Sequence, residues 1–255
     1  MIIEYQRPMN IREALALLAR KQPISYPMGG GTYLNRNLEE KYAVVDLQLL
    51  ELGSIVKKGN YIEVGATATL QELSDFKGLP ADMLTSLERE ITYNLRQMAT
   101  VAGTLVTANG RSPFTTMLLA MDTKLDTLGL DETPKEVNLG DWFPMRGTTD
   151  SAALITKIII PINVIIACES IARTPADQPI VCVAIAQWSS GRTRVALGGW
   201  GEIPTLAMDG PEASGVEIAS KNAYSHAEDA WASAEYRQEM AGLLAARCLQ
   251  RINNQ

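Results

Sequence analysis

Residues 26–34 contain three consecutive glycines, Gly29, Gly30 and Gly31, followed by Thr32. Glycine loses more conformational freedom on folding than any other residue, so such a run indicates special dihedrals or a close backbone approach. Successive N–H groups in a turn of this kind can converge on one point and bind a phosphate. A plain tight loop remains the alternative from this run alone. The run is neither a Walker A loop nor a Rossmann fingerprint, because it lacks the Gly-Lys-Ser/Thr ending of the first and the G-x-G-x-x-G spacing of the second.

A second run of small residues, Ala99-Thr100-Val101-Ala102-Gly103-Thr104, stands later in the chain. One glycine-rich turn has many explanations, whereas two such segments give two places where the backbone can approach the same ligand. The second run therefore makes the first one informative.

The composition excludes several classes of function. The chain has 255 residues, 46% of them hydrophobic, and a net charge of −6, so it can bury a core and is poorly suited to nucleic acid. The longest apolar stretch, residues 154–168, is interrupted by polar residues and Pro161, and no run reaches the ~18 residues of a membrane span. Because the N-terminus lacks a basic region followed by an apolar core, we expect no signal peptide and a cytoplasmic protein.

Cysteine and histidine usage argues against a metal site in this chain. Cys168, Cys182 and Cys248 are far apart and form no C-x-x-C pair, so we expect free thiols. His226 is the only histidine, which excludes a histidine-rich site, and it lies in a polar segment where a solvated role is expected. The sequence predicts no metal ligand.

Hydrophobic periodicity predicts alternating helices and strands in the first two thirds of the chain. The expected helices cover residues 8–20 (with Asn10 as N-cap), a segment beginning after Thr69, 82–98, 113–121 and the region from 215 onward. The expected strands cover residues 21–26, 43–47, 61–66, 124–128, 157–161, and a pair at 180–188 and 194–200 joined at 189–191. We expect a turn at residues 140–144 and a domain boundary near 162–170.

Four motifs together resemble one family, the FAD-binding medium subunit of molybdenum hydroxylases, which includes xanthine dehydrogenase and aerobic carbon monoxide dehydrogenase. Residues 29–34 resemble its Ala-Gly-Gly-Thr-Asp-Leu loop, and residues 96–104 resemble its Arg-Asn-x-Ala-Thr-x-Gly-Gly-Asn loop. Residues 233–244 match a Ser-x-x-Tyr-Arg-x-x-Met-x-x-x-Leu helix, and Arg173 with Asp177 matches an Arg-x-x-x-Asp stretch. The resemblance covers nearly the whole chain in the right order.

The resemblance implies an α+β fold. Two α/β subdomains, about 1–55 and 56–165, would form a PCMH-type FAD-binding domain over residues 1–165. A carbon monoxide dehydrogenase flavoprotein-type C-terminal domain over 166–255 would contain a small antiparallel sheet and a helical bundle.

The resemblance also implies the residues that bind FAD. Backbone N–H groups of the first loop would hold the pyrophosphate, and the second loop would approach its other side. The implied cofactor-binding residues are Met28, Gly29, Gly30, Gly31, Thr32, Tyr33, Leu34, Ala99, Thr100, Ala102, Gly103, Thr104 and Arg111. No side chain here is expected to be catalytic, because the flavin supplies the chemistry.

The implied function is electron transfer within a complex. Substrate would be oxidised at a molybdenum cofactor on a large subunit, and electrons would pass through [2Fe–2S] clusters on a small subunit to FAD on this chain. NAD or another acceptor would then be reduced. Such complexes are commonly dimers of heterotrimers, and the substrate is chosen in the large subunit.

Five positions depart from the family pattern and leave alternatives open. They are Tyr33, Ala102, Thr104, Pro113 and Glu169. Pro113 stands where the family has an aspartate that hydrogen-bonds the adenosine ribose, a role that Arg111 or Ser112 could take over, and Glu169 stands where many members have a lysine near the flavin. Each departure is tolerable where the contact is made by the backbone, but the five together lower the expected affinity, since a lost side-chain hydrogen bond costs on the order of 1 kcal/mol. One alternative is therefore a degenerate scaffold subunit that binds FAD weakly or not at all, and another is a self-contained FAD enzyme such as an oxidase.

Overall fold

The computed structural model describes residues 1–34, 40–147 and 153–254. The chain divides into two compact units, each assembled from several segments. The first unit comprises Met1–Phe76, Tyr93–Thr107 and Lys124–Ile159, and the second comprises Lys77–Thr92, Ala108–Thr123 and Ile160–Gln255. The expected division at residue 165 stays a prediction.

The first unit is a mixture of short helices and two sheets. Its strands are β1 (Ile2–Gln6), β2 (Ser25–Met28), β3 (Tyr42–Asp46), β4 (Ile55–Lys58), β5 (Tyr61–Gly65), β6 (Lys124–Leu128), β7 (Pro134–Asn138) and β8 (Leu154–Pro161), whose last residues pass into the second unit. Its helices are α1 (Ile11–Leu18), the 3₁₀ turn η1 (Gln48–Leu50), α2 (Leu70–Ser74), α4 (Tyr93–Arg96), α5 (Val101–Thr107) and α7 (Leu139–Met145).

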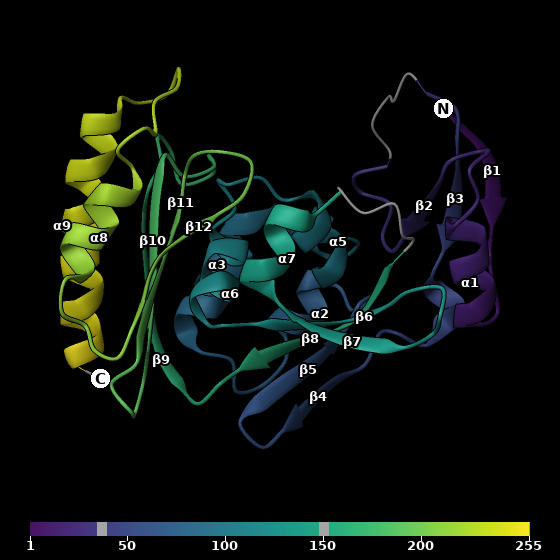
Figure 1. The fold of residues 1–255 in the computed structure, drawn as a ribbon, viewed down its shortest axis with the longest axis horizontal. Coiled ribbons are helices and arrows are strands. Elements are labelled where there is room, and N and C mark those ends of the chain that lie inside the picture. Colours follow the sequence, from purple (N-terminus) through teal and green to yellow (C-terminus); the bar gives the residue numbers. More distant parts are fainter. Residues whose placement is uncertain (35–39, 148–152, 255) are drawn as a thin grey trace. The chain divides into compact units, whose positions relative to one another are not determined.

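The smaller sheet of this unit is parallel. Its order is β1-β3-β2, with Tyr5 opposite Val44 and Met28 opposite Asp46. Figure 1 shows α1 lying against this sheet, and Leu15 of α1 packs with Val45 in a shared hydrophobic cluster. The larger sheet has the order β4-β5-β8-β6-β7, in which β4 pairs with β5, and β6 pairs with both β7 and β8, in antiparallel fashion.

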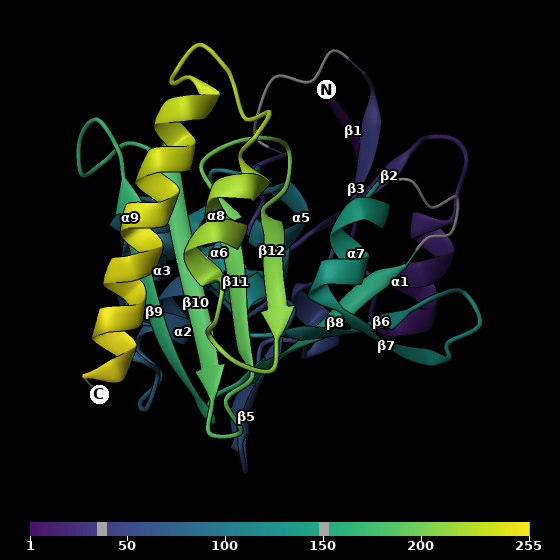
Figure 2. The same cartoon turned by 60° about the vertical axis from the view of Figure 1, so that its left-hand side comes forward.

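The second unit consists of one antiparallel sheet between two helical layers. Its elements are α3 (Ala81–Glu90), α6 (Pro113–Ala120), β9 (Val164–Ile171), β10 (Val181–Trp188), β11 (Thr193–Gly198), β12 (Thr205–Gly210), α8 (Val216–Ala223) and α9 (Ala234–Asn253). The strand order is β12-β11-β10-β9. Figures 1 and 2 show α8 and α9 on one face of this sheet, and α3 and α6 pack against the other face. Both faces of β10 are therefore covered, and its residues Val181 to Ala186 are buried.

Local signals predicted most of these elements. Asn10 caps α1 by accepting a hydrogen bond from the Glu13 amide at 2.9 Å, as expected. The predicted hairpin around residues 189–191 is confirmed as β10 and β11. The mixed helix-and-sheet fold class is confirmed as well.

Three predicted elements are wrong. The strand expected over residues 21–26 begins only at Ser25 and ends at Met28, because residues 21–24 form a turn. The helix expected over residues 82–98 ends at Glu90, because Ile91 is extended (φ −152°, ψ 166°), and a separate short helix, α4, follows. The β-branched pair Ile91 and Thr92 favours such a break. The turn expected at residues 140–144 is the helix α7, and Pro144 occupies its last turn.

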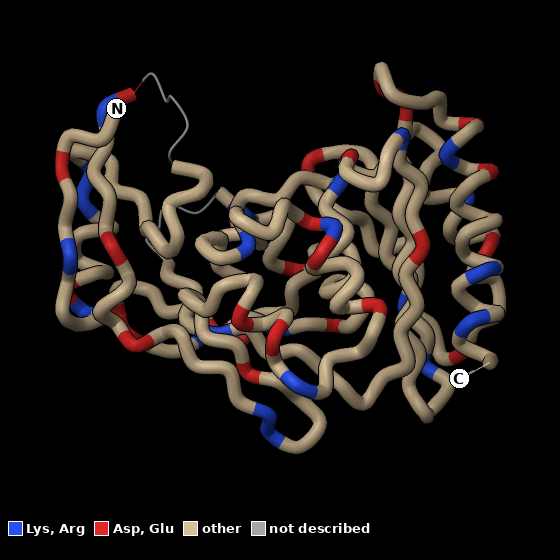
Figure 3. The backbone as a smooth tube through the Cα atoms, turned by 180° about the vertical axis from the view of Figure 1, so that it is seen from behind, with Lys and Arg blue, Asp and Glu red and all other residues tan. Residues whose placement is uncertain are grey.

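Charged residues of both signs are interspersed along the chain (Figure 3). Among the described residues, no helix is long and apolar enough to cross a membrane.

Candidate functional site

The glycine run begins where β2 ends. Because β2 and β3 are parallel, the run leaves the sheet at the carboxyl end of the strands, the edge where ligands bind in α/β folds. The amide of Leu47 donates to the carbonyl of Met28 at 3.0 Å and fixes the start of the run. The amide groups of Gly29, Gly30 and Gly31 donate no hydrogen bond to another described residue. This arrangement is compatible with donation to an anion.

The second predicted loop is in fact the start of a helix. After a turn at residues 97–98, Thr100 forms an isolated antiparallel bridge with Thr69. Helix α5 then begins, and Thr100 acts as its N-cap, because its hydroxyl oxygen accepts from the Gly103 amide at 3.1 Å. The predicted residues Ala102, Gly103 and Thr104 therefore lie in the first turn of α5.

These two segments lie in direct contact within the first unit. A Cβ atom added at Gly30 would lie 1.5 Å from the carbonyl oxygen of Met98, and one added at Gly29 would lie 2.8 Å from the Thr100 side chain. Either methyl group would force the segments apart. Gly31 has a different requirement, since its φ of +69° lies in the left-handed region where other residues are strained. Each of the three positions therefore requires glycine for a different structural reason.

Most of the predicted residues in the first unit have described surroundings. Met28, Thr32 and Leu34 are half-buried, and the Leu34 carbonyl accepts from the Tyr42 hydroxyl at 2.8 Å. Tyr33 is 41% exposed. Ala102 is buried, and the hydroxyl of Thr104 donates to the Thr100 carbonyl at 3.0 Å. Two of the positions that depart from the family pattern, Ala102 and Thr104, therefore help to build α5 itself.

Arg111 belongs to the second unit, unlike the other predicted binding residues. Its guanidinium donates to the carbonyls of Pro179 and Gln178 at 2.8 and 2.9 Å, and it stacks over the Trp231 ring at 4.3 Å. Arg173 stacks on the same ring at 4.5 Å. Burial, more than any neighbouring charge, lowers the pKa of Arg111. These contacts give Arg111 a structural role that the sequence did not indicate.

The remaining departures also have structural partners in the second unit. Glu169 accepts from Arg251 at 2.9 Å, and the same guanidinium contacts both carboxylate oxygens of Asp82 at 2.8 Å. Pro113 is the first residue of α6, where its missing N–H costs nothing, and Ser112 caps that helix.

The three cysteines are free, as expected, with Cys182 and Cys248 buried. Among residues 1–34, 40–147 and 153–254, no group of three or more His, Cys, Asp or Glu side chains could hold a metal ion.

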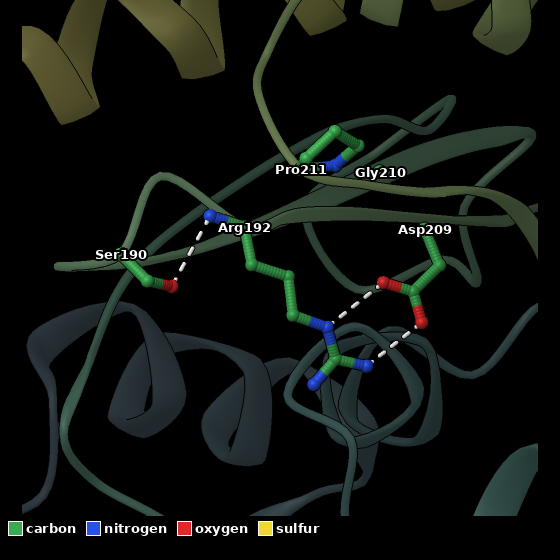
Figure 4. Close-up of a pocket in the computed structure, with 5 residues that line it drawn as sticks. All are labelled: Ser190, Arg192, Asp209, Gly210 and Pro211. Carbon is green, nitrogen blue, oxygen red and sulfur yellow. Dashed lines mark hydrogen bonds and ion pairs between the residues drawn. The ribbon is translucent and has the colours of Figure 1, made fainter.

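A surface pocket of about 440 Å³ lies in the second unit, between the β10–β11 turn and the end of β12 (Figure 4). It is lined by Ser190, Arg192, Asp209, Gly210 and Pro211. Arg192 donates to both oxygens of Asp209, at 2.9 and 2.8 Å, and this pairing raises the pKa of Arg192 and lowers that of Asp209. Because the two charges neutralise each other, we assign this pocket to the packing of the hairpin rather than to a ligand.

Comparisons with known proteins connect this geometry to a cofactor. Residues 1–163 match the family described as the FAD binding domain in molybdopterin dehydrogenase. The chain is 28% identical over 254 residues to the uncharacterized protein YgfM of Escherichia coli (strain K12), covering 96% of this chain and 95% of that protein. It is 23% identical over 276 residues to the carbon monoxide dehydrogenase medium chain of Afipia carboxidovorans, covering 97% and 96%. A structure of reconstituted CO dehydrogenase from Oligotropha carboxidovorans has the same fold, with a TM-score of 0.81 at 22% identity and coverage of 98% and 96%.

Proposed function

The chain belongs to the family of FAD-binding domains of molybdopterin dehydrogenases, and from this premise we propose that it is the electron-transfer flavoprotein subunit of a molybdenum hydroxylase. The family match covers the glycine run and the start of α5 together. It also covers Arg111, whose role as a contact of the cofactor stays a prediction.

The observation that carries this proposal is the contact between the two predicted segments. Gly29 and Gly30 lie against residues 98–100, so the amides after β2 and those in the first turn of α5 belong to one local structure. Amides in a glycine-rich turn suit the pyrophosphate of FAD. At the start of α5, the Val101 and Gly103 amides already donate to the Ala68 carbonyl and the Thr100 hydroxyl, so the glycine run is the main source of free donors. When bound, FAD supplies a redox centre that can accept electrons from [2Fe–2S] clusters and pass them to NAD or another acceptor. The chain's own contribution is to hold and orient the cofactor.

The proposed partners follow from the same family. The Afipia relative is the medium chain of a carbon monoxide dehydrogenase. We infer that this chain assembles with a large molybdenum-cofactor subunit and a small [2Fe–2S] subunit, as a dimer of heterotrimers. Substrate oxidation then takes place on the large subunit, so the substrate is set outside this chain.

A second candidate is a scaffold subunit that keeps its place in the complex without FAD. One observation favours it: packing against Met98 and Thr100 already requires glycine at positions 29 and 30, whether or not a ligand binds. The two candidates differ in a single measurable property, the flavin content.

The experiment is a flavin assay of the native complex. We expect flavin absorbance and about one released FAD per copy of this chain, as a resident cofactor requires. A complex that contains no flavin, and whose purified chain takes up none from excess FAD, would leave the scaffold as the function.

A further inference from the structure

The side chain of Arg96, the last residue of α4, carries two buried nitrogen atoms without partners. Its Nε and Nη1 atoms are both inaccessible to solvent, and neither has a hydrogen-bond partner among the described residues. Arginine stays charged in proteins, and a buried charge without a partner is costly. The stacking of Arg96 over the Tyr93 ring, at 5.8 Å, lies near the limit of a cation–π contact and compensates little. Two of the three guanidinium nitrogens of this half-buried side chain therefore lack an acceptor in the described part of the chain.

Arg96 is close in the chain to the contact between the two predicted segments. The amides of Met98 and Ala99 both donate to the Leu95 carbonyl, at 3.0 and 2.8 Å, so the link from α4 to the site is a tight hydrogen-bonded turn. Met98 is the residue whose carbonyl lies against Gly30. Arg96 is thus held two residues before this contact.

A second unsatisfied group lies on a neighbouring helix. The Oε1 atom of Gln71, on α2, is also buried without a partner. Helix α2 packs against α4, and the Leu70 amide donates to the Ala99 carbonyl at 2.9 Å. Three of the five buried unpaired side-chain nitrogen and oxygen atoms in the described chain therefore belong to Gln71 and Arg96. Buried polar groups are normally paired, so the two unpaired donors of Arg96 indicate a missing acceptor. The Gln71 oxygen is itself an acceptor and would need a donor, so it carries no part of this inference.

The charge of the missing molecule can be inferred from the site. The predicted FAD-binding residues of the first unit, residues 28–34 and 99–104, include no lysine or arginine. A pyrophosphate carries two negative charges, and arginine is the side chain best suited to pair with phosphate oxygens.

We propose that Arg96 is a cofactor-binding residue whose guanidinium donates to the pyrophosphate of FAD. This inference rests on the proposed function. It adds a charged side chain to a site that was otherwise expected to bind through backbone amides.

The test measures FAD affinity and the stability of the apo chain in the same variants. We expect R96M to weaken FAD binding at least tenfold in a flavin-fluorescence titration. The binding of ADP, which has the pyrophosphate without the flavin, should weaken by a similar factor. R96K keeps the positive charge but loses the planar guanidinium, so its FAD affinity should lie between those of R96M and the wild type. R12M is the matched control, because Arg12 is 85% exposed in the same unit and pairs with Glu132 on the surface. Its FAD affinity should equal that of the wild type.

Thermal unfolding of the apo proteins separates a binding role from a structural one. R96M should leave the apo Tm unchanged or raise it, because it removes an unpaired buried charge. A fall in apo Tm together with the loss of affinity, or an R96M chain that binds FAD as tightly as the wild type, would overturn the inference alone. A wild-type chain that binds neither FAD nor ADP would overturn the proposed function as well.

Discussion

The carboxylate of Glu90, at the end of α3, accepts a hydrogen bond from the Ser112 hydroxyl at 2.7 Å, and the same oxygen accepts from the Phe114 amide at 3.2 Å. Burial of this carboxyl group raises its pKa to about 7, and the two hydrogen bonds, which lower the pKa, offset only part of this increase. The folded chain therefore holds a proton on Glu90 at pH values where the unfolded chain, with an ordinary pKa of 4.5, has already released it. As the pH rises from about 4.5 to 7, this group makes the fold progressively less stable.

Glu90→Gln should remove this pH dependence. The neutral amide oxygen can still accept from Ser112 and Phe114, so the variant should match the wild type near pH 4. At pH 8 it should be more stable by about 3 kcal/mol, since each unit of pKa shift corresponds to about 1.4 kcal/mol. Urea denaturation of both proteins at the two pH values measures the difference. An equal difference at pH 4 and pH 8 would show that Glu90 does not titrate in this way.

Gly30→Ala should be far more damaging than an alanine at another glycine of the first unit. Its methyl group would meet the Met98 carbonyl, so we expect a loss of roughly 4 kcal/mol in the free energy of unfolding, together with the loss of FAD binding. Gly59→Ala is the control: Gly59 has a positive φ of +58°, but a Cβ atom added there would meet no other group within 4 Å. It should cost only about 1 kcal/mol and leave FAD binding intact. Similar losses in both variants would contradict the role of the Met98 contact, because Gly30, unlike Gly59, has no positive φ to strain another residue.

Thr100→Ala should weaken the start of α5. The variant loses the cap on the Gly103 amide, which is worth about 1 kcal/mol, and the first turn of the helix becomes less ordered. We expect roughly tenfold weaker FAD binding, equivalent to about 1.4 kcal/mol, by fluorescence titration. Thr100→Ser keeps the hydroxyl and should retain both stability and affinity. If serine proves as damaging as alanine, the methyl group of Thr100 matters and the cap does not.

Arg237→Met should destabilise the second unit severely. The guanidinium of Arg237 is fully buried and donates to the carbonyls of Ile180, Ala227 and Ala232 and to the Asp229 carboxylate. Removing it takes this donor from the three carbonyls, while Asp229 keeps its hydrogen bonds from the amides of Trp231 and Ala232. We expect a loss of about 3–5 kcal/mol.

Arg247→Met, at an exposed position of the same helix, provides the comparison for Arg237. It should change the free energy of unfolding by less than about 0.5 kcal/mol. Chemical denaturation of the two variants measures both effects, and a loss below about 1 kcal/mol for Arg237→Met would contradict the structural role.

The sequence by itself determined the features that depend on neighbouring residues. The Asn10 cap, the hydrophobic face of α1 and the hairpin at residues 189–191 each arise from signals within a few positions. The glycine run likewise predicts a close backbone approach, although it does not identify the segment that is approached. Such signals are readable because hydrogen bonds and side-chain periodicity within one element act over short stretches of chain.

Only the tertiary structure decided which distant groups meet. It ended α3 at Glu90, whose carboxylate pairs with Ser112, and it turned Arg111 toward the carbonyls of residues 178–179. It also buried two nitrogens of Arg96 without a partner. The physical reason is that burial and pairing depend on contacts between segments far apart in the chain. An arginine side chain can be a solvated charge, a structural donor or a ligand contact, and the groups that the fold places beside it decide which.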